Sequence, residues 1–268
     1  IGLGVMGRTH IKAYHAANAR GLPCRLIAVC SADPSQLSGE AAASGNLKSM
    51  AGAERVFDPT HVRTTTNPAD IAANPEIDIV SICTPTDTHA ELAIMMLRAG
   101  KHVLVEKPLA LTTDAVRAVA DAACASGKLC MPGMCMRFWP GWDWLKARVQ
   151  DDSFGRVTSA VFTRVGSRPD WSREFYHDSE RTGGAMFDLH VHDAHFIRLL
   201  FGMPDDVVTR GRTKNGLPEF WHTFFTYRDN DYLVEATSGT TAQQGRAFNH
   251  GFEIHLERAT LQYDLAFI

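Results

Sequence analysis

The sequence lacks three features that would each place the chain in a particular class of protein. It has no apolar run approaching the roughly 18 residues that cross a bilayer, no internal repeat and no low-complexity tract. Its 27 basic and 30 acidic residues leave a formal net charge of −3 and are evenly spread, whereas binding to phosphate backbones needs clustered Lys and Arg. We therefore expect a soluble protein with neither a membrane nor a nucleic acid as direct partner.

Paired cysteines are also missing, because none of the six stands in a C-x-x-C pair. Several lie in segments with the pattern of a buried strand or helix. This favours reduced thiols packed in a core, the alternatives being a disulfide or metal ligation. Reduced thiols in turn favour a cytoplasmic location. The cysteines are Cys24, Cys30, Cys83, Cys124, Cys130 and Cys135.

A complete first strand is absent as well. The glycine-rich turn that begins at Gly2 normally follows a strand, of which only Ile1 is present. We expect the native polypeptide to have an apolar, β-branched strand before Ile1, and to continue past residue 268, where the chain stops within a strand-like run. An export signal farther upstream stays open.

The 268 residues, 45% of them hydrophobic and 21% charged, suffice for two modest domains. Residues 1–132 alternate helical and strand-like segments, which is typical of a doubly wound α/β domain whose parallel sheet is covered on both faces. We expect the stretch 45–66 to be an irregular surface excursion. Helices are expected over about 5–20, 36–44, 88–99 and 113–125, and strands over 26–30, 77–83, 101–105 and 129–131.

Residues 133–268 have a different pattern, with longer predicted strands and fewer helices. A single helix, over about 184–201, ends at Gly202 with Pro204 behind it. This arrangement predicts an α+β domain with a mostly antiparallel sheet. The strands are expected over 157–165, 207–212, 220–227, 233–240 and 252–256.

The first candidate for chemistry is the motif Gly2-x-Gly4-x-x-Gly7, which opens the first helix. Glycines allow close approach of a ligand to the backbone, and the helix N-terminus offers unpaired N–H groups with a positive dipole. A following strand at 26–30 completes the context of a site for a dinucleotide pyrophosphate. The alternative is a glycine turn that serves packing only.

The end of that strand is where the adenosine ribose would be recognised. An acidic residue there would bind the 2′ hydroxyl of NAD, but the sequence has Ser31, with Asp33 two residues later. Loss of the carboxylate favours NADP slightly, although Ala32 supplies no guanidinium for the 2′ phosphate. Alternatively, Ser31 merely starts the turn before Asp33 and Pro34.

Three further motifs make the pattern specific: Glu106-Lys107-Pro108, Cys83-Thr84-Pro85 and the glycine-led segment 183–192. With the glycine motif, the chain resembles the glucose-fructose oxidoreductase, inositol dehydrogenase and MocA family over essentially its whole length. The resemblance implies a Rossmann domain followed by an open-faced sheet domain that binds substrate and mediates oligomerisation. It also implies an NAD(P)-dependent oxidoreductase that acts on a sugar, polyol or cyclitol, as a homo-oligomer (dimer or tetramer).

The resemblance also implies site residues. Lys107, Asp188 and His192 match the family's catalytic positions, and the Lys107–Pro108 peptide bond is expected to be cis. A histidine suits proton abstraction from an alcohol near neutral pH, and Lys107 could polarise the same oxygen. Cofactor contacts are expected from Gly2, Gly4, Val5, Met6, Gly7, Ser31, Thr84, Pro85, His89, Glu106 and Lys107.

Substrate contacts are expected from Trp171, Arg173 and His195, with ordinary packing as the alternative for each. On an α-helix, positions 188, 192 and 195 share a face while 190 points away, so the alternative for this face is a metal held by Asp188, His192 and His195. The family's chemistry needs no metal, and we expect none here. His10, on the first helix, is expected to be structural.

The leading interpretation is reversible oxidation of a secondary alcohol, with the hydride passing to the nicotinamide and the proton to His192. Two alternatives stay open. One is a glycosidase or epimerase of the same family that uses bound NAD transiently. The other is a non-catalytic nucleotide-sensing regulator, in which equivalents of Lys107 or His192 would be lost.

Overall fold

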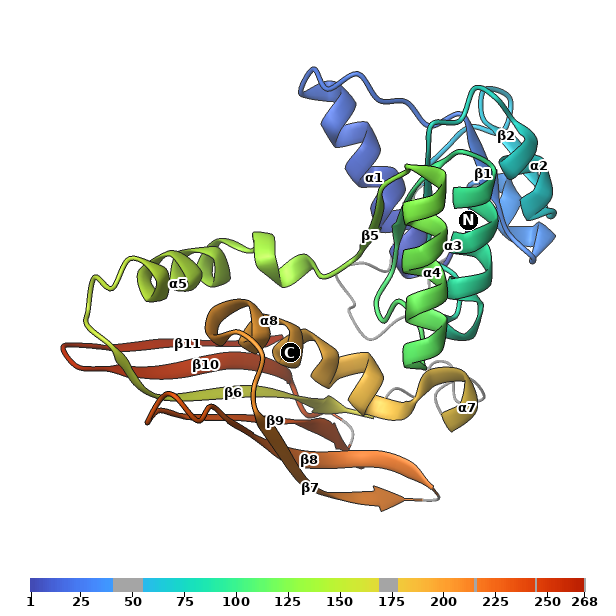
Figure 1. Ribbon diagram of the computed structural model, residues 1–268. Coiled ribbons are helices and arrows are strands. Elements are labelled where there is room, and N and C mark those ends of the chain that lie inside the picture. Colours follow the sequence, from blue (N-terminus) through green and yellow to red (C-terminus); the bar gives the residue numbers. More distant parts are fainter. Residues whose placement is uncertain (41–54, 169–177, 215, 244, 268) are drawn as a thin grey trace. The chain divides into compact units, whose positions relative to one another are not determined.

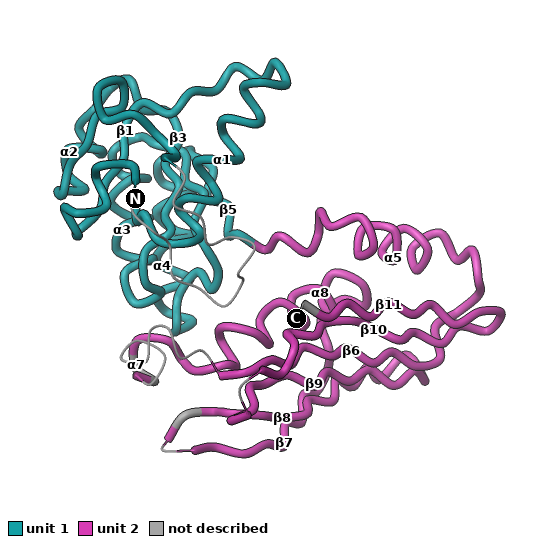
Figure 2. The backbone as a smooth tube through the Cα atoms, turned by 180° about the vertical axis from the view of Figure 1, so that it is seen from behind, with its two compact units in different colours: residues 1–133 teal, residues 134–268 magenta. Residues whose placement is uncertain are grey.

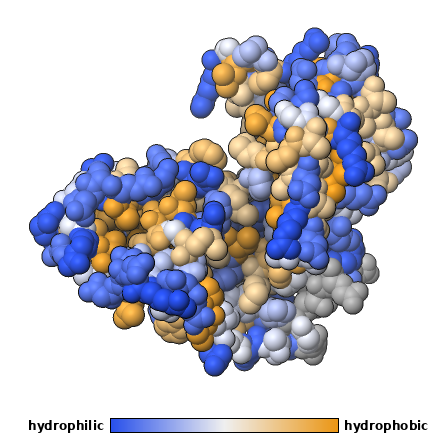
Figure 3. Space-filling view, in the orientation of Figure 1, coloured by the Kyte–Doolittle hydropathy of each residue, from blue (hydrophilic) through white to orange (hydrophobic). Residues whose placement is uncertain are grey.

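The computed structural model describes residues 1–40, 55–168, 178–214, 216–243 and 245–267. The chain forms two compact units, residues 1–133 and residues 134–268 (Figure 2). No helix in these described ranges is long and apolar enough to cross a membrane. Figure 3 shows hydrophilic residues over much of one face of the molecule, with apolar residues gathered in patches between them.

The first unit alternates helices and strands, as the sequence predicts (Figure 1). Its elements are α1 (Val5–Ala19), β1 (Ala28–Cys30), the 3-10 helix η1 (Pro34–Ser38), β2 (Arg63–Thr65), α2 (Pro68–Ala73), β3 (Ile79–Ile82), the 3-10 helix η3 (Thr86–Thr88), α3 (His89–Arg98), β4 (His102–Val105), α4 (Thr113–Ser126) and β5 (Cys130–Pro132).

The strands of this unit are parallel. β1 pairs with β2, and β3 pairs with β4, which pairs with β5. Residues 1 and 2 join the two sets: Gly2 N–H donates to the Cys30 carbonyl (2.8 Å) and Cys83 N–H donates to the Ile1 carbonyl (2.8 Å). The carboxyl ends of β1, β3 and β4 therefore lie on one edge, where open parallel sheets bind ligands.

Both faces of this sheet are covered, because successive side chains of a strand point to opposite faces. Val29 packs in one hydrophobic cluster with Ile11 of α1. The next residue, Cys30, packs in a second cluster with Met96 of α3 and Val119 of α4. The predicted doubly wound α/β unit is thus confirmed.

One predicted helix of the first unit is wrong. Instead of an α-helix over 36–44, the chain forms the 3-10 helix η1, which starts at Pro34 and is capped by the Asp33 carboxylate. Gly39, with φ +81°, ends it in the left-handed conformation. The part of the predicted helix beyond Glu40 lies outside the described residues.

The irregular stretch predicted over 45–66 is also partly wrong. Its described end contains β2, which pairs in parallel with β1. Arg63 and Thr64 are exposed on this edge strand, so no apolar run or alternation marks it in the sequence. A short polar edge strand is stabilised by its ladder hydrogen bonds and not by burial.

The second unit is a six-stranded sheet with helices packed on one face (Figure 1). The strand order is β11-β10-β6-β9-β8-β7; β6 and β9 are parallel, and the other neighbours are antiparallel. The elements are the 3-10 helix η4 (Cys135–Phe138), α5 (Pro140–Gln150), β6 (Val157–Ser167), α7 (Ser179–Thr182), the π-helical turn η5 (Met186–His190), α8 (Val191–Phe201), β7 (Asp206–Lys214), β8 (Leu217–Thr226), β9 (Leu233–Thr241), β10 (Phe248–Leu256) and β11 (Thr260–Phe267).

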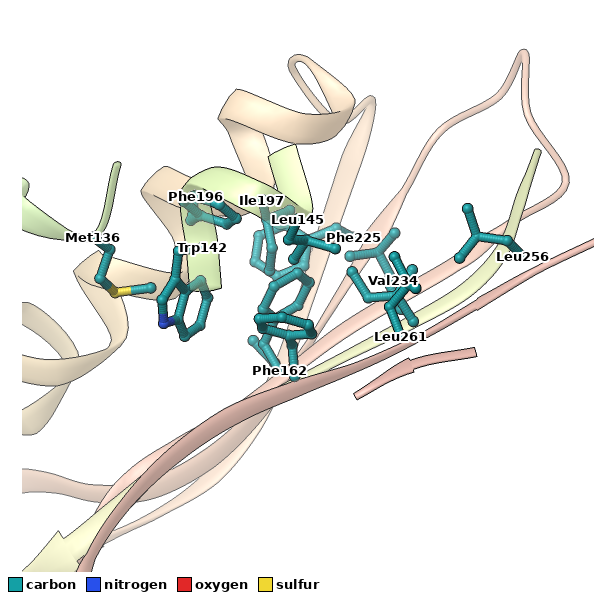
Figure 4. Packing of buried hydrophobic residues seen from close by; sticks show 14 of the residues in the cluster. Met136, Trp142, Leu145, Phe162, Phe196, Ile197, Phe225, Val234, Leu256 and Leu261 are labelled. Atoms are coloured by element: carbon teal, nitrogen blue, oxygen red, sulfur yellow. The ribbon is translucent and has the colours of Figure 1, made fainter. Parts of the chain in front are cut away.

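The core of this unit lies between the sheet and helices α5 and α8 (Figure 4). Trp142 of α5 is fully buried, with its ring centroid 5.0 Å from Phe196 of α8 and 5.1 Å from Phe252 of β10, both edge-on. Such aromatic contacts stabilise beyond the area they bury. The sequence reading missed α5, whose Pro140 occupies the first helical position and whose Trp142 and Leu145 share a face.

The helix predicted over 184–201 needs correction at its start. Gly183 and Gly184 have φ of +69° and +70°, which no α-helix contains, and a π-helical turn over Met186–His190 precedes α8. A Cβ on Gly184 would lie 3.0 Å from Pro218 at the start of β8. The glycines therefore permit a sharp turn and a close approach, and the helix begins only after them.

The aromatic core carries a pH dependence. His250 is fully buried beside Trp142 and Tyr263, and burial, followed by the charge of Arg164, lowers its pKa from 6.5 to about 4. As the pH falls below 6.5, His250 becomes protonated in the unfolded chain while it stays neutral in the folded protein, and this proton uptake favours unfolding. We therefore expect stability to fall between about pH 6.5 and about pH 4, by about 3 kcal/mol from His250.

Denaturant unfolding at neutral pH and near pH 4 measures this loss. The matched variant His250→Phe keeps an aromatic ring but cannot take up a proton, so its stability should fall less over the same interval. An equal fall in both proteins would contradict the assignment.

Candidate active site

The glycine turn of the first unit divides into packing positions and one open position. Gly2 has φ +85°, and a Cβ there would lie 2.6 Å from the Cys83 carbonyl oxygen. A Cβ on Gly7 would overlap the Gly2 carbonyl, whereas a Cβ on Gly4 would meet no atom of the described structure within 4 Å. Gly2 and Gly7 therefore serve close packing, and Gly4 leaves backbone open to a ligand.

The same turn forms the N-terminus of α1. Gly4 is the N-cap residue, no side chain of the described structure caps the helix, and the first turn holds no acidic residue. The first N–H groups of a helix, here beginning at Val5 and Met6, have no partner within the helix and favour an anion. The residues present thus fit the pyrophosphate of a dinucleotide.

The end of β1 presents Ser31, whose side chain is engaged locally. Ser31 is almost fully buried; its hydroxyl donates to Gln36 Oε1 (2.9 Å) and accepts the Asp33 N–H (3.2 Å). The Asp33 carboxylate accepts the Ser35 N–H and hydroxyl. The turn interpretation of Ser31 is therefore supported, and no carboxylate occupies the strand end itself.

The ends of β3 and β4 are joined by His89. It is 1% exposed, with Nδ1 2.8 Å from the Pro108 carbonyl oxygen and Nε2 2.8 Å from the Thr84 carbonyl oxygen. Both ring nitrogens face backbone carbonyls, so we correct its expected role. His89 holds the loops of Thr84-Pro85 and Lys107-Pro108 together and has no surface left for direct contact with a cofactor.

Lys107 is half-buried and lies two residues after the end of β4. The Lys107–Pro108 peptide bond is cis, as predicted. The backbone N–H of Lys107 donates to Oε2 of Glu106 (3.2 Å). Oε1 of the same carboxylate accepts from His10 Nε2 (3.0 Å). The side chain of Glu106 thus spans between α1 and the residue that carries the candidate catalytic amine.

Asp188 and His192 lie in the second unit, on η5 and α8 respectively, and both are half-buried. A π turn closes between residues five apart, so two residues four apart still lie within about one turn. Single π turns inside helices are frequent at functional sites. The expected proximity of a carboxylate to an imidazole therefore survives the change of helix type.

A buried polar network lies under this helix. Arg164 of β6 donates from Nε and Nη2 to the two oxygens of Asp193 (3.0 and 3.1 Å), and both side chains are almost fully buried. Ser238 of β9 donates to Asp193 (3.3 Å) and accepts from His190 Nδ1 (2.8 Å). The side chain of His190 thus points toward the sheet. The bonds of His190 and Asp193 to β6 and β9 fix the rotation of the helix about its axis, and with it the direction of the His192 side chain.

The remaining predicted site residues have separate outcomes. His195 is half-buried, and burial, followed by Arg137 and Arg198, lowers its pKa; its substrate contact stays a prediction. Trp171 and Arg173 lie outside the described residues. Within the described ranges, no group of three or more His, Cys, Asp or Glu is arranged to hold a metal ion.

A cavity of about 470 Å³ in the first unit does not coincide with this site. Its walls are the facing edges of β1 and β3 together with α1, including Ile27, Ile79 and Tyr14. It thus lies within the layer of the sheet. Gly4 and Lys107 do not line it.

Sequence reasoning missed the partners of two site elements. His10 and Glu106 are 96 residues apart, and only the spacing of His10 three residues after Gly7 places it near the turn. Arg164 and Asp193 come from different elements, and the signal for a buried partner was that Arg164 is the one charged residue of strand β6.

Two family models match the chain. Residues 1–134 match the model described as the oxidoreductase family, NAD-binding Rossmann fold. Residues 142–262 match the model of the GFO/IDH/MocA C-terminal domain. The two matches cover both units.

Named relatives agree with these models. An inositol 2-dehydrogenase of Rhizobium meliloti (strain 1021) is 34% identical over 205 residues, covering 75% of this chain and 54% of the relative. Inositol 2-dehydrogenase 2 of Saccharopolyspora erythraea is 31% identical over 252 residues, covering 91% of this chain and 67% of the relative. The chain thus spans about half the length of the first of these.

Among solved structures, the crystal structure of a putative myo-inositol dehydrogenase from Sinorhizobium meliloti 1021 superposes with a TM-score of 0.77. The two chains are 26% identical, and the match covers 97% of this chain and 73% of the other. The similarity extends over both the parallel and the mostly antiparallel unit.

Proposed function

Because the chain belongs to the GFO/IDH/MocA oxidoreductase family, with an NAD-binding Rossmann fold in its N-terminal unit, we propose that it is an NAD(P)-dependent dehydrogenase. Its substrate is a secondary alcohol of a sugar, polyol or cyclitol. The observation that carries this proposal is the open backbone at Gly4 on the sheet edge that also presents Lys107. The inositol dehydrogenases among its relatives support a cyclitol in particular.

The cofactor would be held by the chain's own backbone and loops. The turn Gly2–Gly7 binds the pyrophosphate through N–H groups of α1, and Thr84-Pro85 and Glu106-Lys107 border the same edge. A bound nicotinamide dinucleotide supplies the hydride acceptor. The protein supplies position and proton transfer.

Three side chains carry the proton and bind the substrate. The imidazole of His192 accepts the alcohol proton, a task suited to its range of protonation near neutral pH. The Lys107 ammonium stabilises the negative charge that develops on the same oxygen. Asp188 accepts hydrogen bonds from neighbouring substrate hydroxyls, which orients the ring, and His195 with Trp171 and Arg173 completes the substrate contacts.

A panel of inositols, aldoses and sugar alcohols, each assayed with NAD and with NADP, tests the proposal. We expect substrate-dependent formation of the reduced nicotinamide, followed by its absorbance. A protein that binds the cofactor tightly but gives no net reduction with any member of the panel would refute the dehydrogenase assignment.

For the cofactor, we propose a slight preference for NADP, supported by Ser31 at the end of β1. The variant Ser31→Asp should shift the ratio of kcat/KM toward NAD by about tenfold, or about 1.4 kcal/mol, because a carboxylate there binds the 2′ hydroxyl and repels a 2′ phosphate. The control Ser38→Asp adds the same charge at the exposed end of η1. A wild-type protein that already favours NAD tenfold contradicts this preference.

We also propose a homo-oligomer formed through the sheet face that α5 and α8 do not cover. Val208 of β7 and Phe224 of β8 are paired in register, and their exposed fractions are 40% and 49%. The chain neighbours of Phe224, Thr223 and Phe225, are buried on the other face. Sedimentation equilibrium reads the assembly directly, and a strictly monomeric protein would exclude it.

A further inference from the structure

His10 has a place in the fold that its expected structural role does not explain. It lies on α1, between one and two turns after the helix begins at Val5. The turn Gly2–Gly7 at the N-terminus of this helix, with its open backbone at Gly4, is called the glycine cradle below. Its side chain is 15% exposed, and it donates from Nε2 to Oε1 of Glu106, whose side chain is 12% exposed. The Cys83 side chain is its second partner. His10 thus contacts the residues that directly follow β3 and β4.

Glu106 transmits this contact to the next residue. Its backbone N–H donates to the Ile82 carbonyl (2.9 Å), so its main chain belongs to the sheet. Its Oε2 accepts the N–H of Lys107 (3.2 Å), and a Cβ on Gly133 would lie 3.4 Å from this oxygen. The carboxylate is therefore confined, with one oxygen on His10 and the other on the Lys107 peptide.

We infer that His10 is a positioning residue: acting through Glu106, it fixes the peptide that carries Lys107 and ties that lysine to the helix of the cofactor cradle. This inference rests on the proposed role of Lys107 in the dehydrogenase reaction. The inference adds His10 to the proposed site. In the sequence, only its spacing of three residues from Gly7 indicates this role.

The charge state of the pair favours this role. Cys83 and then Glu106 raise the pKa of His10 from 6.5 to about 10, so the imidazolium faces the carboxylate at neutral pH. A charge-assisted hydrogen bond is stronger and shorter than a neutral one. Without the cation, a partly buried carboxylate would lie beside Lys107 and rearrange or attract the ammonium.

Two neighbours on α1 provide the comparison. His15 also bonds through Nε2, but to the Val56 carbonyl (3.0 Å), away from the strand ends. The hydroxyl of Thr9 donates to the Val5 carbonyl within the helix. Of these three polar residues, His10 alone reaches the segment of Lys107. His15→Gln is thus a matched control on the same helix.

The kinetic test is a double-mutant cycle on the full chain. A displacement of about 1 Å at a catalytic group lowers the rate about 10²-fold, so we expect His10→Ala to lower kcat by that order with little change in the substrate KM. In a Lys107→Ala background the same substitution should cost nothing further, because His10 acts through Lys107. His10→Gln keeps a hydrogen bond and should lie between, while His15→Gln should match wild type.

A second readout does not depend on turnover. Acylation of Lys107, followed by peptide mass spectrometry, should slow by at least about threefold in His10→Gln, because the neutral amide no longer offsets the charge of the Glu106 carboxylate, which then favours the protonated amine. Half-buried Lys128 in the same unit is the internal reference. An unchanged Lys107 rate, or an equal loss of kcat with and without Lys107, would overturn the inference. A wild type inactive on every substrate would refute the proposed function, and the acylation rates would still decide the role of His10.

Discussion

Replacing His192 with alanine is expected to lower kcat by about 10²–10⁴-fold, the usual contribution of a positioned general base. The Kd of the cofactor should stay near wild type, because the glycine cradle lies in the other unit. Steady-state kinetics on a substrate confirmed by the panel, together with cofactor titration, measure both quantities. His222→Ala, which removes an exposed histidine of β8, is the control.

Lys107→Ala should act in the same way, and the double variant should lose less than the product of the two effects, because in the proposed mechanism both groups serve one oxygen. Asp188→Asn should raise KM more than it lowers kcat if Asp188 mainly binds substrate hydroxyls. Near-full activity of His192→Ala would contradict the proposed role of His192 as the general base. Loss of activity on chelation with recovery on adding Zn²⁺ would instead favour a metal held by Asp188, His192 and His195.

Local signals predicted much of the first unit. The helices expected over 88–99 and 113–125 are present as α3 and α4, and Gly100 and Gly127 follow them with φ of +77° and +63°. The Thr112 side chain caps α4. Short apolar runs such as that of β3 identify strands buried on both faces. These features depend on residues within one turn or one strand, so the sequence displays them directly.

The features that the sequence did not predict depend on residues far apart in the chain. β2 is fixed by pairing with β1, more than 30 residues earlier, and nothing in its own polar side chains predicts it. Directly before the π turn of η5, Gly184 packs closely against Pro218 of β8. The link from His10 to Glu106 crosses 96 residues. In each case tertiary contacts, and not local propensity, decide the conformation.

The largest stability effect should come from the pair Arg164 and Asp193. Asp193→Asn leaves a buried guanidinium without its counter-charge, and removal of one partner of a buried ion pair typically costs about 3–5 kcal/mol. Denaturant unfolding, followed by the fluorescence of buried Trp142 in the same unit, measures the change. The exposed pair Arg156 and Glu257 is the control, and Glu257→Gln should leave the unfolding midpoint where wild type has it.

A double replacement separates stability from function. Well-packed apolar side chains often replace a buried ion pair without loss of stability, so Arg164→Met with Asp193→Leu should recover most of what Asp193→Asn loses. It should not recover kcat, because the apolar pair lacks the directional bonds by which Arg164 and Ser238 hold the residue next to His192. Recovery of both stability and kcat would mean that packing alone orients α8. Recovery of stability alone would show that the charged pair of Arg164 and Asp193 directs His192, the proposed general base.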